Sequence, residues 1–425
     1  MQATSITGRS TKVEAPLHAI LLDDQDRGSA SPDVHTNLDC TVSVIDSLPA
    51  LDAFIPEWKA LLECGELSAS FHQHPDVFRL MLEDDEPTLQ PCVIVVRRRS
   101  RIECIAPCYL QNGRFQLMIS VAAVASWRVR QLRIAGDEFI CRSDGASTDV
   151  CIDAVFGALR AQAPPFDLIR VFNLAASGPV RKYFQSERPH AFVFVSSSGP
   201  EKVIQAQLGA DYAAYLASLN GRVRQKLLRR TRDFSKHANG AVGLVAVTRP
   251  EQVRDFLADV DAVYSQTWQC KTYGVRNRNT PRDIAYYEAI AKKGWLRSYI
   301  LRAPQPVAFV VGYQFAGTYH YEETGYDQRW TEWGPGAVLT HQLIEDLFQR
   351  DTPHTLDFGF GDAQYKRTLG NVEHDAYAGY FVLRNRWRGL LRAQQILNLV
   401  SGATRSALIR FRLDAHVRRI VKRRS

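Results

Sequence analysis

The stretch from Thr318 to Lys366 constrains the fold of this chain more than any other. Thr318 to Tyr326 is rich in Tyr and Thr and has no Gly or Pro before Gly325, which predicts a strand. Behind Pro335, apolar residues recur at helical spacing, namely Leu339, Leu343, Ile344, Leu347 and Phe348. Proline is well accepted in the first turn of a helix. A second strand is predicted over Thr355 to Gly359, so the stretch indicates a strand–helix–strand unit.

The turn Gly334-Pro335-Gly336 joins the first of these strands to the helix. A helix start presents unpaired backbone N–H groups at its positive end, and glycine lets an anion approach the backbone closely. We therefore expect a phosphate site here, formed by the backbone N–H groups of Gly334, Gly336 and Ala337. An ordinary tight turn between a strand and a helix needs the same residues, so the turn by itself leaves both interpretations open.

Two motifs in this stretch resemble a known family. Thr331 to Ala337, TEWGPGA, resembles the pyrophosphate loop Q/R-x-x-G-x-G/A of GNAT-type acyl-CoA transferases, with Thr331 where that family has Gln or Arg. Asp357 to Lys366, DFGFGDAQYK, resembles the DFG-x-G-x-x-x-YK ending of the CelD/BcsL-like acetyltransferase branch. The resemblance extends from about Asp211 to Leu383, and more loosely over the N-terminal half, where Phe71 to Leu82 resembles the family's early helix. It implies acetyl-CoA or another acyl-CoA as co-substrate, bound through Thr331 and the glycine turn, and no metal.

The resemblance also implies catalytic roles. GNAT-type enzymes let an acceptor amine or hydroxyl attack a thioester, which needs a base, donors for the oxyanion and an acid for the departing thiolate. Glu323 or Glu322 would be the base, and only one should face the acceptor because adjacent strand residues point to opposite faces. Tyr365 would protonate the thiolate, while Lys366 and Asp357 would orient the acceptor or steady charge. Structural interpretations stay open: the glutamates as strand-surface residues, Asp357 as a turn cap and Lys366 as a solvated side chain.

A repeat in the predicted elements indicates two similar halves. A helix predicted from Ser147 is followed by a strand from Asp167, and the helix from Pro335 by a strand from Thr355, a separation of 20 residues in both cases. We therefore expect an α/β (α+β) fold of two tandem GNAT-like domains, similar to Fem-type transferases. Mixed, mostly antiparallel sheets flanked by helices are expected in both.

The expected domains follow from this repeat. Residues 1–38 are polar and predicted to be disordered. Residues 39–200 form the first half, where the loop before the helix makes a poor pyrophosphate receptor, and residues 201–383 hold the acyltransferase site. This second half begins with a helix predicted over Asp211 to His237, which has an apolar stripe and many Arg and Lys on its other faces. Those basic residues are either a solvated face or a positive rim that guides an anionic acceptor or the CoA phosphates.

The positive charge of the chain is concentrated in its last residues. Residues 384–425 hold twelve Arg and Lys and one acid, Asp414, a net charge of +11, which leaves −3 for the rest of a chain with +8. Apolar residues at helical spacing accompany this charge, which is typical of a segment on an anionic membrane surface. A helix packed on its own domain by the apolar stripe has the same pattern. Nucleic-acid binding is disfavoured because no recognised motif accompanies the charge.

Cysteine pattern and hydropathy bear on location. The eight cysteines are dispersed without a C-x-x-C pair, which argues against a zinc ribbon and indicates reduced thiols. No stretch has the ~18 to 20 apolar residues of a spanning helix, and the N-terminus lacks the pattern of a signal peptide. We expect a cytoplasmic protein, with peripheral contact to the inner face of the membrane through its tail.

Two classes of function remain open from the sequence. The first is an acyl-CoA-dependent N- or O-acyltransferase, by resemblance an acetyltransferase, which acts on a sugar, amino-sugar or lipid-linked intermediate in cellulose or exopolysaccharide production. The second keeps the tandem fold but uses aminoacyl-tRNA as donor, as Fem-type peptidyltransferases do. A non-catalytic scaffold of a polysaccharide-synthesis complex is a more distant third. The glycine turn favours the first, because Fem-type enzymes have less need of a pyrophosphate site.

Overall fold

The computed structural model describes residues 40–83, 89–119, 122–143, 147–186, 190–197, 199–275, 277–361, 363–383 and 387–397. The first elements are β1 (Cys40–Ile45), α1 (Leu48–Glu63), η1 (Phe71–Gln73), α2 (Pro75–Met81), β2 (Leu89–Arg98), β3 (Arg101–Ile119), β4 (Ala122–Ile134), η2 (Ala135–Asp137), β5 (Ile140–Cys141), α3 (Thr148–Ala161), β6 (Leu168–Ala175), α4 (Pro179–Gln185), β7 (Phe192–Ser196) and β8 (Glu201–Gln207). They are followed by α5 (Tyr212–Ser218), α6 (Gly221–His237), β9 (Gly243–Val247), η3 (Pro250–Gln252), α7 (Val253–Tyr264), α8 (Trp268–Tyr273), α9 (Pro281–Lys292), β10 (Ser298–Ala303), β11 (Gln305–Phe315), β12 (Thr318–Tyr326), η4 (Gln328–Trp333), α10 (Pro335–Arg350), β13 (Thr355–Phe360), α11 (Gln364–Leu369) and β14 (Val372–Leu383). Residues 387–397 are helical, whereas the predicted disordered segment 1–38 and residues 398–425 of the tail lie outside the described residues.

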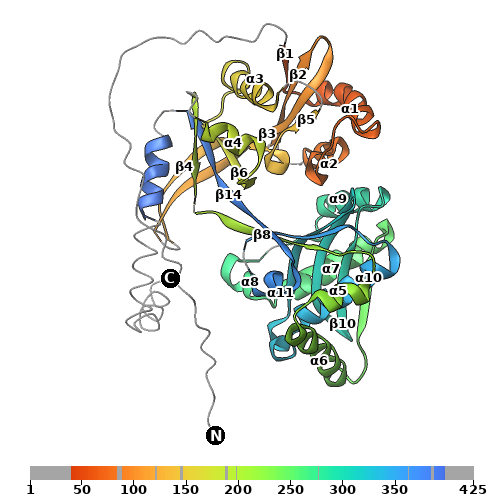
Figure 1. The fold of residues 1–425 in the computed structure, drawn as a ribbon. Helices are drawn as coiled ribbons and strands as arrows, with labels where there is room; N and C mark the ends of the chain where they lie inside the picture. Colours follow the sequence, from red (N-terminus) through yellow and green to blue (C-terminus); the bar gives the residue numbers. More distant parts are fainter. Residues whose placement is uncertain are drawn as a thin grey trace. The chain divides into compact units, whose positions relative to one another are not determined.

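The strands form one 14-stranded sheet in which most neighbours are antiparallel (Figure 1). The order is β1-β2-β3-β4-β6-β14-β8-β13-β12-β11-β10-β9, with β5 paired to β3 and β7 to β14. Parallel pairing joins β4 to β6 and β12 to β13. The mixed, mostly antiparallel α/β arrangement expected from the sequence is therefore confirmed.

The repeat expected from the sequence is present in the elements themselves. Helix α3 starts at Thr148 and β6 at Leu168, while α10 starts at Pro335 and β13 at Thr355, so the separation is 20 residues in both halves. In each half the helix connects two parallel strands that are neighbours in the sheet. The same local unit has thus been used twice along the chain.

Strands from the two halves of the chain pair with each other, which was not predicted from the sequence. Strand β8 pairs with β13 and also with β14. Strand β14, the last of the described strands, pairs with β8 through its first residues and with β6 and β7 through its later ones. These pairings join segments far apart in the sequence, and Figure 1 shows β8 and β14 side by side. The domain boundary predicted at residue 200 stays a prediction.

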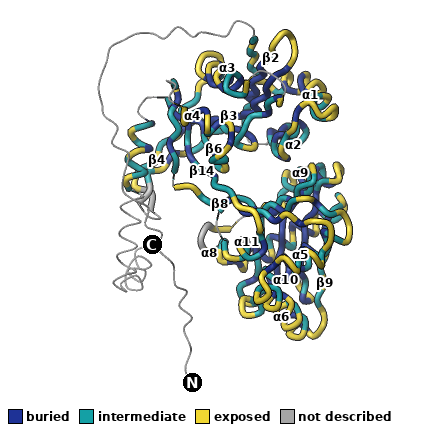
Figure 2. The backbone as a smooth tube through the Cα atoms, in the orientation of Figure 1, coloured by how far each residue is buried: buried dark blue, intermediate teal, exposed yellow. Residues whose placement is uncertain are grey.

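Helices cover both faces of the sheet around β11. Ala308 and Val310 of β11 join a buried cluster that includes residues of α6 and α10, while Phe309 and Val311 join a cluster from α7 and α9. Successive side chains of a strand point to opposite faces, so burial on both sides explains the continuous apolar run of this strand. Figure 2 shows the buried backbone gathered in such strands and much of the exposed backbone on the helices.

Two predicted elements differ in detail from the structure. The helix predicted over Asp211 to His237 is two helices, because the chain breaks between α5 and α6. The side chain of Asn220 accepts a hydrogen bond from the N–H of Arg222 at 3.0 Å and caps α6. Tyr365 and Lys366, for which no helix was predicted, lie in the short helix α11.

Two kinds of feature are absent from the residues that the structure describes. No helix in this part of the chain is both long and apolar enough to cross a bilayer. Over the same residues, no group of three or more His, Cys, Asp or Glu side chains is arranged to hold a metal ion.

Candidate active site

Strands β12 and β13 stop pairing part-way along their length. They pair in parallel through Thr318 to His320 and Thr355 to Asp357, and the described residues show no pairing between them beyond these positions. We call the following segments, Tyr321 to Tyr326 and Phe358 to Phe360, the wedge. Strand edges without a partner present backbone N–H and C=O groups that a substrate can bind. The chain leaves the wedge through η4 and enters α10.

The first turn of α10 has the features of an anion site. Gly334 adopts a left-handed conformation, with φ 63° and ψ 52°, which glycine accepts without strain. The N–H of Gly336 has no hydrogen-bond partner within the described residues, and it lies at the helix end that favours anions. The exposed Arg230 of α6 brings its Nη1 to 3.6 Å from the position that a Cβ on Gly334 would occupy. A phosphate at this turn would therefore meet a backbone donor and a guanidinium.

Other donors predicted for this turn are already used inside the protein. The N–H of Gly334 donates to the carbonyl of Thr331 at 3.2 Å, and the N–H of Ala337 donates to the carbonyl of Gly334 at 3.0 Å. The Thr331 hydroxyl donates to the carbonyl of Gln328 at 2.7 Å. These bonds arise because the chain enters α10 through the tight turn η4. Among the predicted contacts, Gly336 is thus the one whose N–H is unused in the described structure.

Tyr365, in α11, packs against both strands of the wedge from the face of the sheet that α6 and α10 cover. Its ring centroid is 6.1 Å from that of Tyr321 on β12 and 5.9 Å from that of Phe358 on β13. Burial, with a further contribution from Tyr321, raises the pKa of the Tyr365 phenol above its ordinary value. A phenol with a raised pKa stays protonated at neutral pH. Because a raised pKa also makes the phenol a weaker acid, the case for Tyr365 as a proton donor rests on its position, and its role stays a prediction.

A β-bulge in β12 alters the orientation expected for the two glutamates. The register with β11 shifts between Val311 and Gly312, whose partners are Glu323 and Tyr321. Glu322 is therefore an extra residue that has no partner on β11, and the regular alternation of side chains is interrupted there. The expectation that the glutamates point to opposite faces assumed a regular strand.

The charges of both glutamates affect the pKa values of tyrosines in α9. Burial raises the pKa of Tyr286, and the charge of Glu322 adds to this effect. Burial also raises the pKa of Tyr287, to which the charge of Glu323 contributes. Glu323 forms an ion pair with Arg278, whereas Glu322 is exposed. Glu323 pairs with Val311, which joins the cluster of α7 and α9, whereas Tyr365 packs with the cluster of α6 and α10, so the wedge has a carboxylate on one face of the sheet and a phenol on the other.

His320, which the sequence analysis did not single out, faces Asp357 at the last paired position of β12 and β13. Burial lowers the pKa of His320, an effect that the charge of Asp357 opposes. A histidine with a lowered pKa is neutral at pH 7 and can accept a proton. The sequence held a signal for this pair. Two parallel strands that begin in register at Thr318 and Thr355 bring residues 320 and 357 opposite each other.

Asp357 and Lys366 both hold the backbone at the end of β13. Asp357 Oδ1 accepts a hydrogen bond from the N–H of Gly359 at 2.7 Å, and its Oδ2 accepts one from Gln205 Nε2 at 3.1 Å. Lys366 is buried, and its Nζ donates to the carbonyls of Gly359 and Phe360 at 3.1 and 3.0 Å. Burial lowers the pKa of Lys366. The structure thus shows Asp357 as a turn cap and excludes the interpretation of Lys366 as a solvated side chain.

Comparison with known proteins identifies the domain that contains this site. Residues 221–367 match the model of a family described as Acetyltransferase (GNAT) domain. The match includes Arg230 and the strands, turn and helices that carry the wedge. Residues 221–367 are therefore a GNAT-type domain, and an acyl-transfer activity is supported. No curated protein is matched by the sequence.

Several solved structures are similar to this chain at low sequence identity. They include a crystal structure of FemX, with 10% identity and a TM-score of 0.47, over 79% of this chain and 100% of that one. A tandem GNAT protein from the clavulanic acid biosynthesis pathway has 12% identity and a TM-score of 0.46, over 82% of this chain and 99% of that one. L-PGS from Bacillus licheniformis has 11% identity and a TM-score of 0.44, over 83% of this chain and 97% of that one.

Proposed function

We propose that this protein is an acyl-CoA-dependent N- or O-acyltransferase that transfers an acetyl group. The observation that carries the proposal is the arrangement at the wedge. The Gly336 N–H and the Arg230 guanidinium lie at the start of α10, and the ring of Tyr365 packs against both strands of the wedge. This combination suits a donor with a pyrophosphate at one end and a thioester at the other.

The proposed reaction uses both faces of the wedge. The acceptor nitrogen or oxygen attacks the thioester carbon from the α9 face, its bond to carbon forms, and the carbon–sulfur bond breaks. The acceptor's proton passes to a base on that face, where Glu322, Glu323 and His320 lie. The thiolate receives a proton from Tyr365 on the opposite face. No covalent enzyme intermediate is needed in this sequence of steps.

An anionic acceptor is supported by two arginines of the first half. Arg133 and Arg170 stack on Phe172, with their guanidinium carbons 4.1 and 4.3 Å from its ring centroid. Burial raises the pKa of Asp137, while the charges of Arg133 and His72 lower it. The charge of His72 also lowers the pKa of His320, for which burial is the larger cause. Contacts connect these arginines to the wedge: the N–H of Phe172 donates to Asp137 Oδ1 at 3.0 Å, and Gln73 Nε2 donates to the carbonyl of Glu138 at 2.7 Å. The ring of Phe71, two residues before Gln73, lies 6.2 Å from the ring of His320.

We therefore propose an acceptor that carries phosphate, namely a sugar or amino-sugar phosphate or a lipid-linked intermediate. The resemblance to the CelD/BcsL-like branch supports a place in cellulose or exopolysaccharide production. A Fem-like transferase that uses aminoacyl-tRNA is the alternative, and a scaffold of a polysaccharide-synthesis complex is a third. The anion site at α10 supports the first proposal, because it matches the pyrophosphate of CoA.

Calorimetry with the full chain tests the donor. Titration with acetyl-CoA, CoA and uncharged tRNA should show binding of the two CoA compounds. Gly336→Val should abolish CoA binding because the new side chain stands between the ligand and the free N–H. The matched control is Gly243→Val in β9, where a Cβ would meet no atom within 4 Å. Binding of tRNA without binding of CoA at millimolar concentration would favour the Fem-like alternative.

A further inference from the structure

Strands β3 and β4 continue past their neighbours as a two-stranded ribbon. Strand β2 pairs with β3 only as far as Gln111, and β6 pairs with β4 only over Gln131 to Arg133. Residues 112–117 and 124–129, which we call the ribbon, therefore pair only with each other among the described strands. Strand edges of this kind bind other molecules readily unless the protein protects them.

The outer end of the ribbon is uncharged and partly exposed. The sequence from Phe115 to Trp127 contains no charged residue. Leu117 pairs with Ala125, and the register then shifts, so Val124 is an extra residue in a bulge. The Val124 side chain is 53% exposed. A bulge disfavours pairing with a further strand, so a partner at this end would contact side chains such as Val124 and not the strand edge.

Two arginines lie directly opposite each other on the two strands of the ribbon, next to its uncharged residues. Arg114 and Arg128 are register partners, both are exposed, and no hydrogen bond or ion pair joins either to another described residue. Like charges in directly opposite positions destabilise a pair of strands, so this arrangement suits an anionic ligand. Arg130 differs, because it donates to the carbonyl of Pro165 at 3.1 Å and to Gln90 Oε1 at 2.6 Å.

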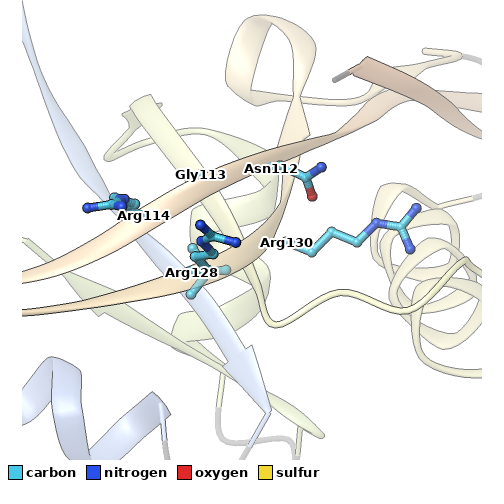
Figure 3. Close-up of a pocket in the computed structure, with 6 residues that line it drawn as sticks. Asn112, Gly113, Arg114, Arg128 and Arg130 are labelled. Atoms are coloured by element: carbon cyan, nitrogen blue, oxygen red, sulfur yellow. The ribbon is translucent and has the colours of Figure 1, made fainter. Parts of the chain in front are cut away.

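Figure 3 shows the arginine side chains extending from the two strands of the ribbon. They border a shallow hollow that is lined by Asn112, Gly113, Arg114, Arg128, Val129 and Arg130. The lining holds three cations and no acid. The charge of this surface therefore complements a phosphate-rich partner.

We propose that the ribbon docks on an anionic phospholipid surface. Val124 enters the interfacial layer, and the guanidinium groups of Arg114 and Arg128 contact the lipid phosphates. Long basic side chains flanking an apolar segment place their charge at the headgroup level while the segment meets the acyl chains. The same surface would bring a lipid-linked acceptor to this protein, although docking does not depend on that acceptor.

The basic tail begins beside the ribbon. The ring of Trp387, in the helical segment 387–397, lies 5.9 Å from the ring of Phe115, and its Nε1 donates to Asp167 Oδ1 at 3.3 Å. The described start of the basic tail therefore lies against the ribbon that carries the arginine pair. An RNA ligand would also suit the arginines, but it gives no reason for an uncharged end with an exposed valine. The combination favours a membrane.

Co-sedimentation of the full chain with vesicles tests this proposal. Vesicles of phosphatidylcholine alone and of phosphatidylcholine with about a third of phosphatidylglycerol should be compared, and we expect binding to the anionic ones. Arg114→Gln/Arg128→Gln should weaken that binding by roughly thirty-fold, since each basic residue near an anionic surface contributes a factor of about five. Val124→Asp should also weaken binding, in a way that added salt does not reproduce.

The matched control replaces two exposed arginines elsewhere, Arg160→Gln/Arg254→Gln, and should change binding less than about two-fold. Circular dichroism of each variant verifies that it folds. Unchanged vesicle binding in both ribbon variants would overturn the proposal, and a loss of binding only on deletion of residues 405–425 would assign attachment to the tail alone. Loss of binding to a mixed-sequence RNA, with vesicle binding intact, would assign the arginine pair to nucleic acid instead.

Discussion

His320 and Asp357 face each other at the position where β12 and β13 stop pairing. Burial lowers the pKa of His320, and the charge of Asp357 partly opposes this. The neutral imidazole is therefore the main form at pH 7, as a general base requires. The pair stands at the inner end of the wedge, beside the bulge that carries Glu322.

The first prediction concerns the base. If His320 accepts the proton of the acceptor, kcat/KM should be level above pH 6.5 and fall only at lower pH, because the pKa of His320 is lowered. His320→Gln should reduce kcat/KM by roughly 10² or more. Asp357→Asn should move the fall to still lower pH, since it removes a charge that raises the pKa of His320.

Matched pH profiles of Glu322→Gln and Glu323→Gln identify the base among the three candidates. If a glutamate is the base, its Gln variant loses the activity and His320→Gln keeps the wild-type profile. That result would assign His320 a role in packing.

The second prediction concerns Arg230. Its guanidinium lies beside the left-handed Gly334, and loss of one exposed charged hydrogen bond typically costs about 1 kcal/mol. Arg230→Gln should therefore weaken CoA binding by roughly five-fold, and added salt should reduce the difference between the two proteins. Calorimetry at low and high salt measures this. Arg232→Gln, on the same helix and also exposed, serves as the control. Equal effects of both variants would indicate that the overall positive charge of α6 attracts CoA, and that Arg230 makes no specific contact with it.

The third prediction concerns stability and Glu138. Burial raises the pKa of Glu138 from 4.5 to about 7. Below pH 4.5 the carboxyl is protonated in the folded and the unfolded protein. Between pH 4.5 and 7 only the unfolded protein releases the proton, so the free energy of unfolding falls as the pH rises. Above pH 7 the folded protein carries the full free-energy cost of the buried carboxylate. A shift of this size corresponds to about 3 kcal/mol. Glu138→Gln should accordingly stabilise the fold at pH 8 by up to this amount.

Urea unfolding at pH 4.5 and pH 8 measures the effect. The Glu138→Gln variant should show the gain at pH 8 and little at pH 4.5. The exposed Glu63→Gln should show neither. A gain of the same size at both values of pH would mean that relief of packing, and not the shifted pKa, explains the stabilisation.

Local patterns predicted the unit from β12 to β13 well. The helical spacing behind Pro335 and the Tyr- and Thr-rich strand are properties of contiguous residues, and the structure has both elements at the expected places. The break between α5 and α6 was also readable, since Asn220 before Gly221 is a helix-start signal inside the predicted helix. There the long apolar stripe suggested one continuous helix.

Features that depend on distant partners were not predictable in this way. Strands β8 and β14 pair with strands far away in the sequence. Their own residues do not show which strands they pair with or in which register. Arg230 was one of many basic residues on its helix, and only the packing of α6 on α10 selects it. The bulge at Glu322 depends on the register with β11, and it changed the expected orientation of the glutamates.

The last prediction concerns Tyr365 as the proton donor to the thiolate. The phenol has a raised pKa because it is buried, and its ring contacts both strands of the wedge through Tyr321 and Phe358. Tyr365→Phe keeps the ring and these contacts but removes the proton. Turnover should fall by roughly 10² or more, while the affinity for CoA should change little. Steady-state kinetics and calorimetry on the same preparation measure the two quantities.

Tyr321→Phe provides the matched control, since its hydroxyl bonds Thr324 and Thr340 at 3.1 and 3.2 Å and has no proposed role in proton transfer. It should retain most of the turnover. A fall in CoA affinity together with turnover in Tyr365→Phe would mark Tyr365 as a residue that shapes the donor site. Full activity of Tyr365→Phe would show that water or another group protonates the thiolate, because the phenylalanine leaves the wedge filled and removes only the hydroxyl.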